Sequence, residues 1–138
     1  MSNDKFIPLG VPNIAGNEWK YVKDCLDTGW ISSVGSYVTQ FEEMVAGFAG
    51  AKYGVAAVNG TAALHISLLL SGVKENDYVI LPNLTFVASA NSIKYLGAEP
   101  LLIDADPDLW QIDLDLLEEF LENETDEKNG DLIYIKDG

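Results

Sequence analysis

The chain has 138 residues, of which 22 are acidic and eight are basic, giving a formal net charge of −14. Every basic residue is a lysine, and so acidic a surface repels a phosphate backbone, so we expect no nucleic-acid partner. No apolar run approaches the roughly 18 residues that a membrane span needs, so we expect no membrane association. The single cysteine, Cys25, excludes an internal disulfide and is typical of the reducing cytoplasm, where we expect the protein to work.

The acidic residues are concentrated in the last quarter of the sequence. Residues 1–103 carry nine acids and six lysines, a net charge of −3, whereas residues 104–138 carry thirteen acids and two lysines, a net charge of −11. Such a run is usually a solvated helix face followed by a polar loop, and we favour this interpretation over a surface for a cationic partner. The nearly neutral body of the chain does not forbid an anionic ligand.

The amino-terminal part of the chain is predicted to be helical. Apolar residues recur at helical spacing in two stretches, and a glycine follows each of them. These stretches are residues 17–26 and 37–49. We therefore expect residues 1–50 to form an amino-terminal helical segment and residues 51–138 to form a separate α/β unit.

From residue 53 onward, short apolar runs alternate with helical patterns. The predicted strands are 53–58, 78–81, 100–103 and 132–135, and the predicted helices between them are 62–70, 86–96 and 113–121. Strands that are apolar throughout are typical of parallel sheets covered on both faces, so we expect a three-layer α/β/α arrangement with a mostly parallel sheet. The helix at 62–70 is apolar on most sides and is expected to be well buried.

Two features indicate an incomplete protein. A sheet of three or four parallel strands is small, and its apolar edges need partners. The sequence also stops just after a predicted turn, where a return strand is expected. We therefore expect the chain to be a fragment or a truncated form of a longer protein.

The most informative motif is Asn59-Gly60-Thr61, where a predicted strand turns directly into a predicted helix. The first turn of a helix has unpaired N–H groups and the positive end of the helix dipole, so it can bind a phosphate without Arg or Lys. Gly60 lets the backbone approach the ligand, the Thr61 hydroxyl can donate to a phosphate oxygen, and the small Ala62 leaves space. The alternative is a plain turn with Asn59 or Thr61 as an ordinary helix cap.

A second junction follows the next predicted strand. Phe86 begins a helix at the same edge of the sheet as Gly60, the edge where open α/β sheets bind ligands, and its ring can stack on a flat ligand or belong to the core. Asp104, after the third strand, lies at this edge too, and we favour a capping role for it over ligand binding. His65 is expected to be a packed, hydrogen-bonded core residue, and no metal site is expected because no second histidine exists.

Six motifs in order make the sequence resemble the amino-terminal part of the DegT/DnrJ/EryC1/StrS family of sugar aminotransferases. They are Gly16-Asn17-Glu18, Gly29 to Gly35, Phe41-Glu42, Val58 to Leu64, Pro82 to Ala88 and Leu102-Ile103-Asp104. Each motif is weak alone, but together they are specific, and the resemblance covers roughly residues 6–122. The opening most resembles the branch that aminates UDP-linked 4-keto-6-deoxy amino sugars of the legionaminic or bacillosamine type.

The resemblance implies part of the large domain of a fold-type-I enzyme that uses pyridoxal 5′-phosphate. Such an enzyme is a homodimer that moves an amino group from glutamate to a nucleotide-linked 4-keto-6-deoxy sugar. The residues that match the cofactor site are Gly60, Thr61 and Ala62 at the phosphate and Phe86 on the pyridine ring. The loop that contains Trp30 and Ser32 is expected to touch the nucleotide sugar.

The resemblance also places the Schiff-base lysine of the family, and the acid that holds the pyridine nitrogen, beyond Gly138. We therefore expect no catalytic residue in this chain and no aminotransferase activity from it alone. Lys52 and Lys94 lie in unrelated contexts and are assigned no catalytic role, and residues 122–138 resemble a variable polar hairpin.

Three alternatives stay open at this point. The first is a pyridoxamine-dependent sugar dehydratase of the same fold, in which a histidine replaces the lysine. The second is a non-catalytic homologue that has lost the lysine. The third is an unrelated nucleotide-binding α/β module, which would bind a nucleotide without pyridoxal phosphate.

Overall fold

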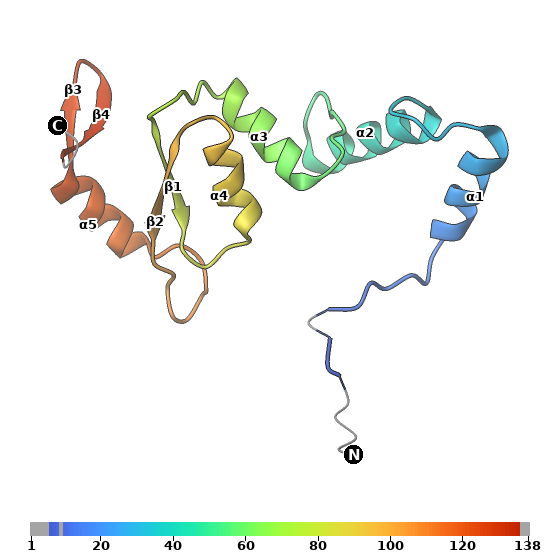
Figure 1. Ribbon diagram of the computed structural model, residues 1–138, viewed down its shortest axis with the longest axis horizontal. Coiled ribbons are helices and arrows are strands. Elements are labelled where there is room, and N and C mark those ends of the chain that lie inside the picture. The colour runs from blue at the N-terminus through green and yellow to red at the C-terminus, as the bar shows by residue number, and fades with distance from the viewer. Residues whose placement is uncertain (1–5, 9, 136–138) are drawn as a thin grey trace. The chain divides into compact units, whose positions relative to one another are not determined.

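The computed structural model describes residues 6–8 and 10–135, and the chain divides into two compact units, Met1–Ala56 and Ala57–Gly138 (Figure 1). The outer ends of the two regions expected from the sequence, residues 1–5 and 136–138, lie outside the described residues. None of the helices in the described part is long and apolar enough to cross a membrane.

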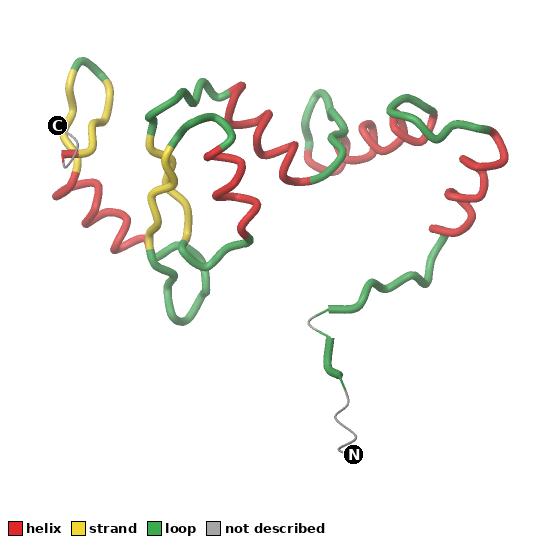
Figure 2. The backbone as a smooth tube through the Cα atoms, viewed as in Figure 1, coloured by secondary structure: helices red, strands yellow, loops and turns green. Residues whose placement is uncertain are grey.

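The first unit contains two helices, α1 (Glu18–Thr28) and α2 (Ser36–Ala49), which confirm the two helices predicted there (Figure 2). Each helix ends at a glycine in the left-handed conformation, Gly29 with φ 75° and Gly50 with φ 66°. A side chain at this φ would be strained, so glycine at these two positions stops each helix.

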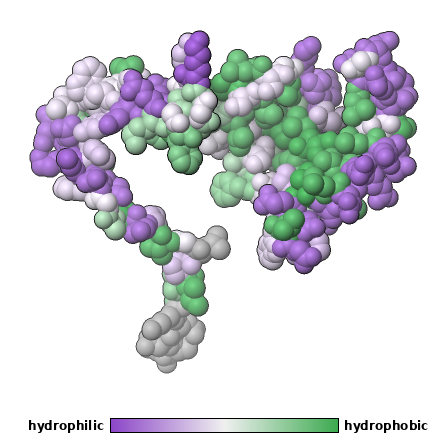
Figure 3. Space-filling view, turned by 180° about the vertical axis from the view of Figure 1, so that it is seen from behind, coloured by the Kyte–Doolittle hydropathy of each residue, from purple (hydrophilic) through white to green (hydrophobic). Residues whose placement is uncertain are grey.

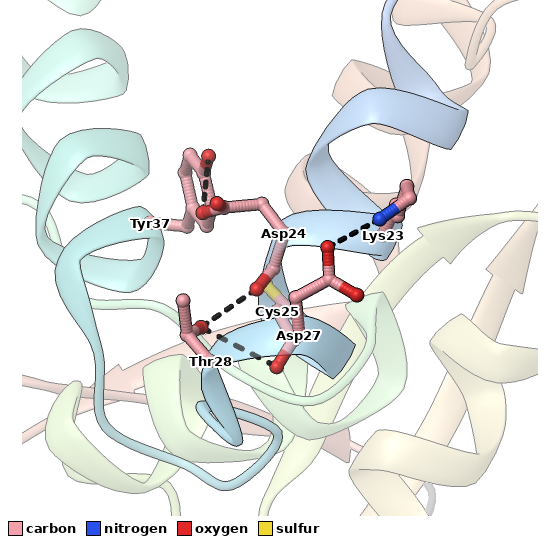
Figure 4. Close-up of polar contacts among 6 residues, drawn as sticks. All are labelled: Lys23, Asp24, Cys25, Asp27, Thr28 and Tyr37. Atoms are coloured by element: carbon pink, nitrogen blue, oxygen red, sulfur yellow. Dashed lines mark hydrogen bonds and ion pairs between the residues drawn. The ribbon is translucent and has the colours of Figure 1, made fainter.

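A small polar network joins the end of α1 to the start of α2 (Figure 4). The Tyr37 hydroxyl donates to Oδ2 of Asp24 at 3.0 Å, and the Tyr37 ring meets the Tyr21 ring edge-on at a centroid distance of 5.1 Å. Thr28 donates its hydroxyl to the Asp24 carbonyl at 2.6 Å, and Lys23 pairs with Asp27 one turn apart. The Tyr37 contacts connect the two ends of the loop between the helices, and the Thr28 and Lys23 contacts stabilise the end of α1.

The Asp24–Tyr37 contact makes folding sensitive to high pH. Ionisation of Tyr37 loses the hydrogen bond to Asp24 and adds a second negative charge there, so the pKa of Tyr37 is raised above its ordinary value of about 10. The stabilisation is complete below pH 10 and is lost as the pH rises through the raised pKa. In an ultraviolet titration of tyrosinate, we expect a late step, above the ordinary range for tyrosine, that belongs to Tyr37. Asp24→Ala removes both the hydrogen-bond acceptor and the charge, so it should remove this late step, and persistence of the step would contradict the assignment.

The segment after α2 is held against that helix at two points. The Ala56 N–H donates to Oε1 of Glu42 at 2.8 Å. Gly54 lies so close to α2 that a Cβ built on it would be 2.5 Å from the Glu42 carbonyl oxygen, a distance that real Cβ atoms do not show. The Glu42 backbone and side chain therefore both order residues 54–56.

The strand predicted over 53–58 is wrong. These residues are neither helix nor strand in the structure, and Val55 and Val58 are 90% and 89% exposed. A strand exists only where a neighbouring strand takes its backbone hydrogen bonds, and no strand of the described residues does so for this segment. The apolar pattern therefore indicates a segment that is suited to a sheet, but it does not provide the neighbouring strand that the segment needs.

The second unit is built on two parallel strands, β1 (Tyr78–Pro82) and β2 (Glu99–Ile103), in register from Tyr78 opposite Glu99 to Pro82 opposite Ile103. Helix α4 (Val87–Lys94) connects them and packs on both. A core of Leu81, Ile93 and Ala98 lies between helix and sheet. The α/β class and the parallel pairing are thus confirmed, and the sheet has two parallel strands where three or four were expected.

Helix α3 (Gly60–Leu70) precedes β1 and packs beside α4. The expectation that it is well buried is wrong, because none of its residues is buried and Leu70 is 82% exposed. Its composition is nearly uniformly apolar, but the described residues cover only the side that faces α4 and the core. Figure 3 shows apolar side chains gathered on one face of this second unit.

The last elements form a helix and a hairpin. Helix α5 (Leu114–Glu124) is capped by the Asp113 carboxylate, and it leads into the antiparallel pair β3 (Thr125–Lys128) and β4 (Asp131–Tyr134). The polar hairpin is confirmed, whereas the placement of 132–135 as a further parallel strand is wrong. Asn129 and Gly130 both have positive φ, 59° and 89°, which is the two-residue turn that joins antiparallel neighbours.

Candidate functional site

The first turn of α3 leaves two backbone donors without partners. Asn59 is the N-cap, and its side-chain oxygen accepts from the Ala62 N–H at 2.9 Å while its carbonyl accepts from Ala63 at 3.1 Å. Within the described part of the chain, the N–H groups of Gly60 and Thr61 donate to no acceptor. Of the two cap residues that the sequence allows, Asn59 and Thr61, it is Asn59 that caps the helix.

The space next to these donors is open. A Cβ built on Gly60 would meet no atom within 4 Å, so a ligand can approach its backbone directly. The Thr61 hydroxyl is not used as the cap, and in the residues described here it makes no other hydrogen bond. These two N–H groups and the hydroxyl lie at the positive end of an 11-residue helix, and together they are suited to binding an anion. The N–H of Ala62, by contrast, is already taken by Asn59.

An open pocket of about 530 Å³ lies beside this turn, between α3 and the end of α4. It is lined by Asn59, Thr61, Ala62, His65, Ile66 and Tyr95. The His65 ring packs against the Tyr95 ring at a centroid distance of 5.6 Å. The expectation of a hydrogen-bonded core histidine is wrong, because His65 is only half-buried and its contact is with an aromatic ring.

Phe86 lies at the start of α4 and presents its ring to solvent. It is the N-cap residue, with its carbonyl accepting from the Ser89 N–H at 3.0 Å, and its side chain is 79% exposed. The alternative that Phe86 belongs to the core is therefore excluded in this structure. An exposed aromatic ring fixed by a helix start is suited to stacking on a flat ligand.

Other residues singled out in the sequence have local structural partners. The Asp104 carboxylate accepts from the N–H of the adjacent Ala105 at 3.0 Å, and the next helix, α5, is capped by Asp113, so Asp104 is not its cap. The Lys52 ammonium lies 5.1 Å from the Tyr53 ring centroid, and Lys94 pairs with Glu99. Across residues 6–8 and 10–135, no three His, Cys, Asp or Glu side chains are arranged to hold a metal ion.

Trp30 and Ser32 belong to the first unit, in the loop between α1 and α2. Trp30 lies against Gly35, 3.7 Å from the position of a Cβ there, and Ser32 is exposed. The Trp30 side chain therefore packs within its own loop. The role of both residues at a nucleotide sugar stays a prediction.

Sequence reasoning missed Ser92. It is the one polar side chain that is fully buried in the described part of the chain, at 0% exposure. Its hydroxyl lies 2.7 Å from the Ala88 carbonyl and 3.2 Å from the Thr61 carbonyl, and so reaches the first turn of α3. No local sequence signal identifies it, because the contact that singles it out is with a residue 31 positions away in another helix.

Comparison with known proteins gives consistent results. The sequence model of the family described as the DegT/DnrJ/EryC1/StrS aminotransferase family matches residues 12–129 of this chain. GDP-perosamine synthase of Escherichia coli O157:H7 is 44% identical over 121 residues, which cover 88% of this chain and 33% of that protein. GDP-perosamine synthase of Caulobacter vibrioides is 46% identical, covering 86% of this chain and 32% of that protein. The chain thus spans about a third of the length of these curated relatives.

Solved structures agree in fold. A Streptococcus pneumoniae protein described as a putative sugar aminotransferase, solved in PMP and PLP forms, is 34% identical with a TM-score of 0.72, over 82% of this chain and 28–29% of those chains. An aminotransferase from Psychrobacter cryohalolentis is 30% identical with a TM-score of 0.71, over 78% of this chain and 28% of that chain. The α/β unit is therefore part of a fold-type-I structure.

Proposed function

Because the chain belongs to the DegT/DnrJ/EryC1/StrS aminotransferase family, we propose that its α3–α4 region is the cofactor-binding part of a pyridoxal-phosphate-dependent sugar aminotransferase. The observation that carries this proposal is the pair of unpartnered N–H groups of Gly60 and Thr61 beside an open approach. The site chemistry fits a phosphorylated ring, because an anion site and an exposed aromatic ring begin two helices that pack together.

Each residue has a distinct task in this proposal. The Gly60 and Thr61 amides and the Thr61 hydroxyl bind the phosphate, and Ala62 contributes its small size. Phe86 covers one face of the pyridine ring and excludes water from it. The bound cofactor supplies an electron sink for moving an amino group between carbon atoms. The covalent chemistry needs a lysine that we assign to none of the described residues.

We propose that the substrate is a nucleotide-linked 4-keto-6-deoxy sugar and that glutamate donates the amino group. The relatives named GDP-perosamine synthase support a GDP-linked sugar over the UDP-linked amino sugars of the legionaminic or bacillosamine branch that the sequence motifs favoured. Trp30 and Ser32 remain our candidates for touching this substrate. We also propose a cytoplasmic homodimer, and the single Cys25 fits a reducing compartment.

A dehydratase of the same fold is the second candidate. GDP-4-keto-6-deoxymannose-3-dehydratase matches with 24% identity and a TM-score of 0.70, a likeness that establishes the fold alone. The curated relatives named as synthases and aminotransferases are 36–46% identical, and they favour amino transfer. The two activities differ in product, because only amino transfer adds nitrogen to the sugar.

Binding of pyridoxamine 5′-phosphate tests the proposal most simply. This form carries an amine, so it forms no Schiff base with the eight lysines of the chain. We expect saturable binding that inorganic phosphate competes away, and a weaker response to pyridoxamine without its phosphate. Thr61→Val should weaken the binding, whereas the remote Thr125→Val should not. Binding that is indifferent to phosphate would contradict the proposal. Supplied with cofactor, glutamate and a GDP-linked keto sugar, the 138-residue chain alone should transfer no amino group.

A further inference from the structure

The hydroxyl of Ser92 joins the two helices that carry the proposed site. It lies within hydrogen-bond distance of the Ala88 carbonyl in its own helix, at 2.7 Å, and of the Thr61 carbonyl in α3, at 3.2 Å. A serine has one hydroxyl proton, so it can donate to only one of these carbonyls at a time. The 3.2 Å contact nevertheless places α4 directly against Thr61, the residue whose amide and hydroxyl face the ligand in the proposed site.

Helices α3 and α4 run in the same direction (Figure 1). Thr61 lies against Ser92, and one turn further along both helices His65 lies against Tyr95. Phe86 precedes Ser92 by six positions, which places it about 9 Å along α4 at a rise of about 1.5 Å per residue. The crossing at Ser92 thus lies between the phosphate-binding turn and the aromatic ring. Any change in how closely the helices pack there alters the spacing between the two halves of the site.

The helix packing leaves α4 little freedom to adjust. Ile93, next to Ser92, is 2% exposed, and Ala98 in the same core is 0% exposed. Ser92 itself is fully buried between α4 and α3, so a larger side chain has no solvent to turn into. Protein interiors are close-packed, so added volume at this position has to move a helix.

We propose that Ser92 is a positioning residue that sets the spacing between the phosphate-binding turn at Gly60–Thr61 and the ring-stacking Phe86. This inference rests on the proposed function and deepens it. A ligand that reaches both halves depends on their spacing, whereas a ligand that occupies only the phosphate turn does not. Widening the helix crossing therefore weakens the binding of a phosphorylated ring selectively.

The test compares two probes on the isotopically labelled 138-residue chain. Inorganic phosphate reports on the turn alone, and pyridoxamine 5′-phosphate reports on the turn and the ring together. Each is titrated while the amide signals of Gly60, Thr61 and Phe86 are followed by nuclear magnetic resonance. In Ser92→Val we expect affinity for pyridoxamine 5′-phosphate to fall about tenfold and affinity for inorganic phosphate to change less than twofold, because only the spacing of the two halves has changed.

Two further variants separate positioning from general damage. Ser92→Ala keeps the packing close to native and loses only the hydroxyl, so we expect a smaller fall, about threefold, confined to the same probe. The matched control is Ser71→Ala, which removes a hydroxyl 2.9 Å from the Ser67 carbonyl at the exposed far end of α3. This control should change neither affinity.

The outcomes distinguish the possible failures. An equal loss of both affinities in Ser92→Val would mean that the variant damages the turn itself, and it would overturn a positioning role. Unchanged affinities would overturn it as well. If Ser92→Val does not fold, Ser92→Ala provides the test, because a positioning role still requires a loss of affinity for pyridoxamine 5′-phosphate without a loss for inorganic phosphate. If the wild-type chain binds neither probe at Gly60, the proposed function fails and the role of Ser92 with it.

Discussion

Replacing Phe86 with alanine is expected to lower the affinity for pyridoxamine 5′-phosphate about tenfold and to leave the free energy of unfolding unchanged. The Phe86 ring is 79% exposed, and none of its contacts in the described part of the chain is with another ring, so folding loses little with it. Stacking of an aromatic ring on a flat heterocycle is worth about 1–3 kcal/mol, and about 1.4 kcal/mol corresponds to tenfold in affinity. The measurement is a binding titration together with urea unfolding of the same samples.

Two variants control this experiment. Phe86→Trp keeps an aromatic face and should retain most of the affinity. Phe48→Ala removes a phenylalanine that is even more exposed, 96% accessible on α2, and should have no effect on binding. An unchanged affinity in Phe86→Ala would show that this ring does not touch the ligand. A large loss of stability would instead show that Phe86 belongs to the folded core.

Substituting Gly54 with alanine is expected to destabilise the first unit by about 1–3 kcal/mol, the usual cost of overpacking. The new methyl group would lie 2.5 Å from the Glu42 carbonyl oxygen, which is backbone within α2 and cannot turn away. Relief of the clash moves residues 54–56 away from the helix and breaks the hydrogen bond from Ala56 to Glu42. Amide hydrogen exchange at Ala56 measures this directly, and we expect faster exchange in the variant.

The matched control is the same substitution at Gly47. This glycine lies inside α2, and a Cβ built on it meets no atom within 4 Å. Alanine is favoured over glycine in a helix interior by about 1 kcal/mol, so Gly47→Ala should stabilise α2 and slow the exchange at Ala56. If both substitutions change the exchange rate at Ala56 in the same direction, the close approach of Gly54 to α2 does not determine that rate.

Local signals in the sequence predict the helices and the site turn well. The positions of α1 and α2 follow from apolar spacing and from the glycines that end them, both of which act within a few residues. The Asn59-Gly60-Thr61 motif predicts the open helix start because capping also depends only on nearby atoms. Phe86 was recognised through its place after a strand, and its exposure supports that interpretation.

Features that depend on distant partners could not be predicted in the same way. The apolar run at 53–58 suits a strand, but pairing needs a neighbour that sequence periodicity does not supply. The burial of α3 depends likewise on what covers it, so its composition alone gave the wrong answer. The apolar run at 132–135 favours a strand of the parallel sheet, whereas the Asn129-Gly130 dipeptide before it favours the antiparallel hairpin that the structure shows. Ser92 matters through its contact across two helices, which no local pattern indicates.

The central claim is that the amide groups of Gly60 and Thr61 bind the phosphate of a vitamin B6 cofactor. A crystal structure of the chain with pyridoxamine 5′-phosphate tests it most directly. We predict phosphate oxygens within about 3 Å of both backbone nitrogens and of the Thr61 hydroxyl, as hydrogen bonding requires, with the pyridine ring against Phe86. A phosphate bound elsewhere, with these two N–H groups still without a partner, would contradict the account.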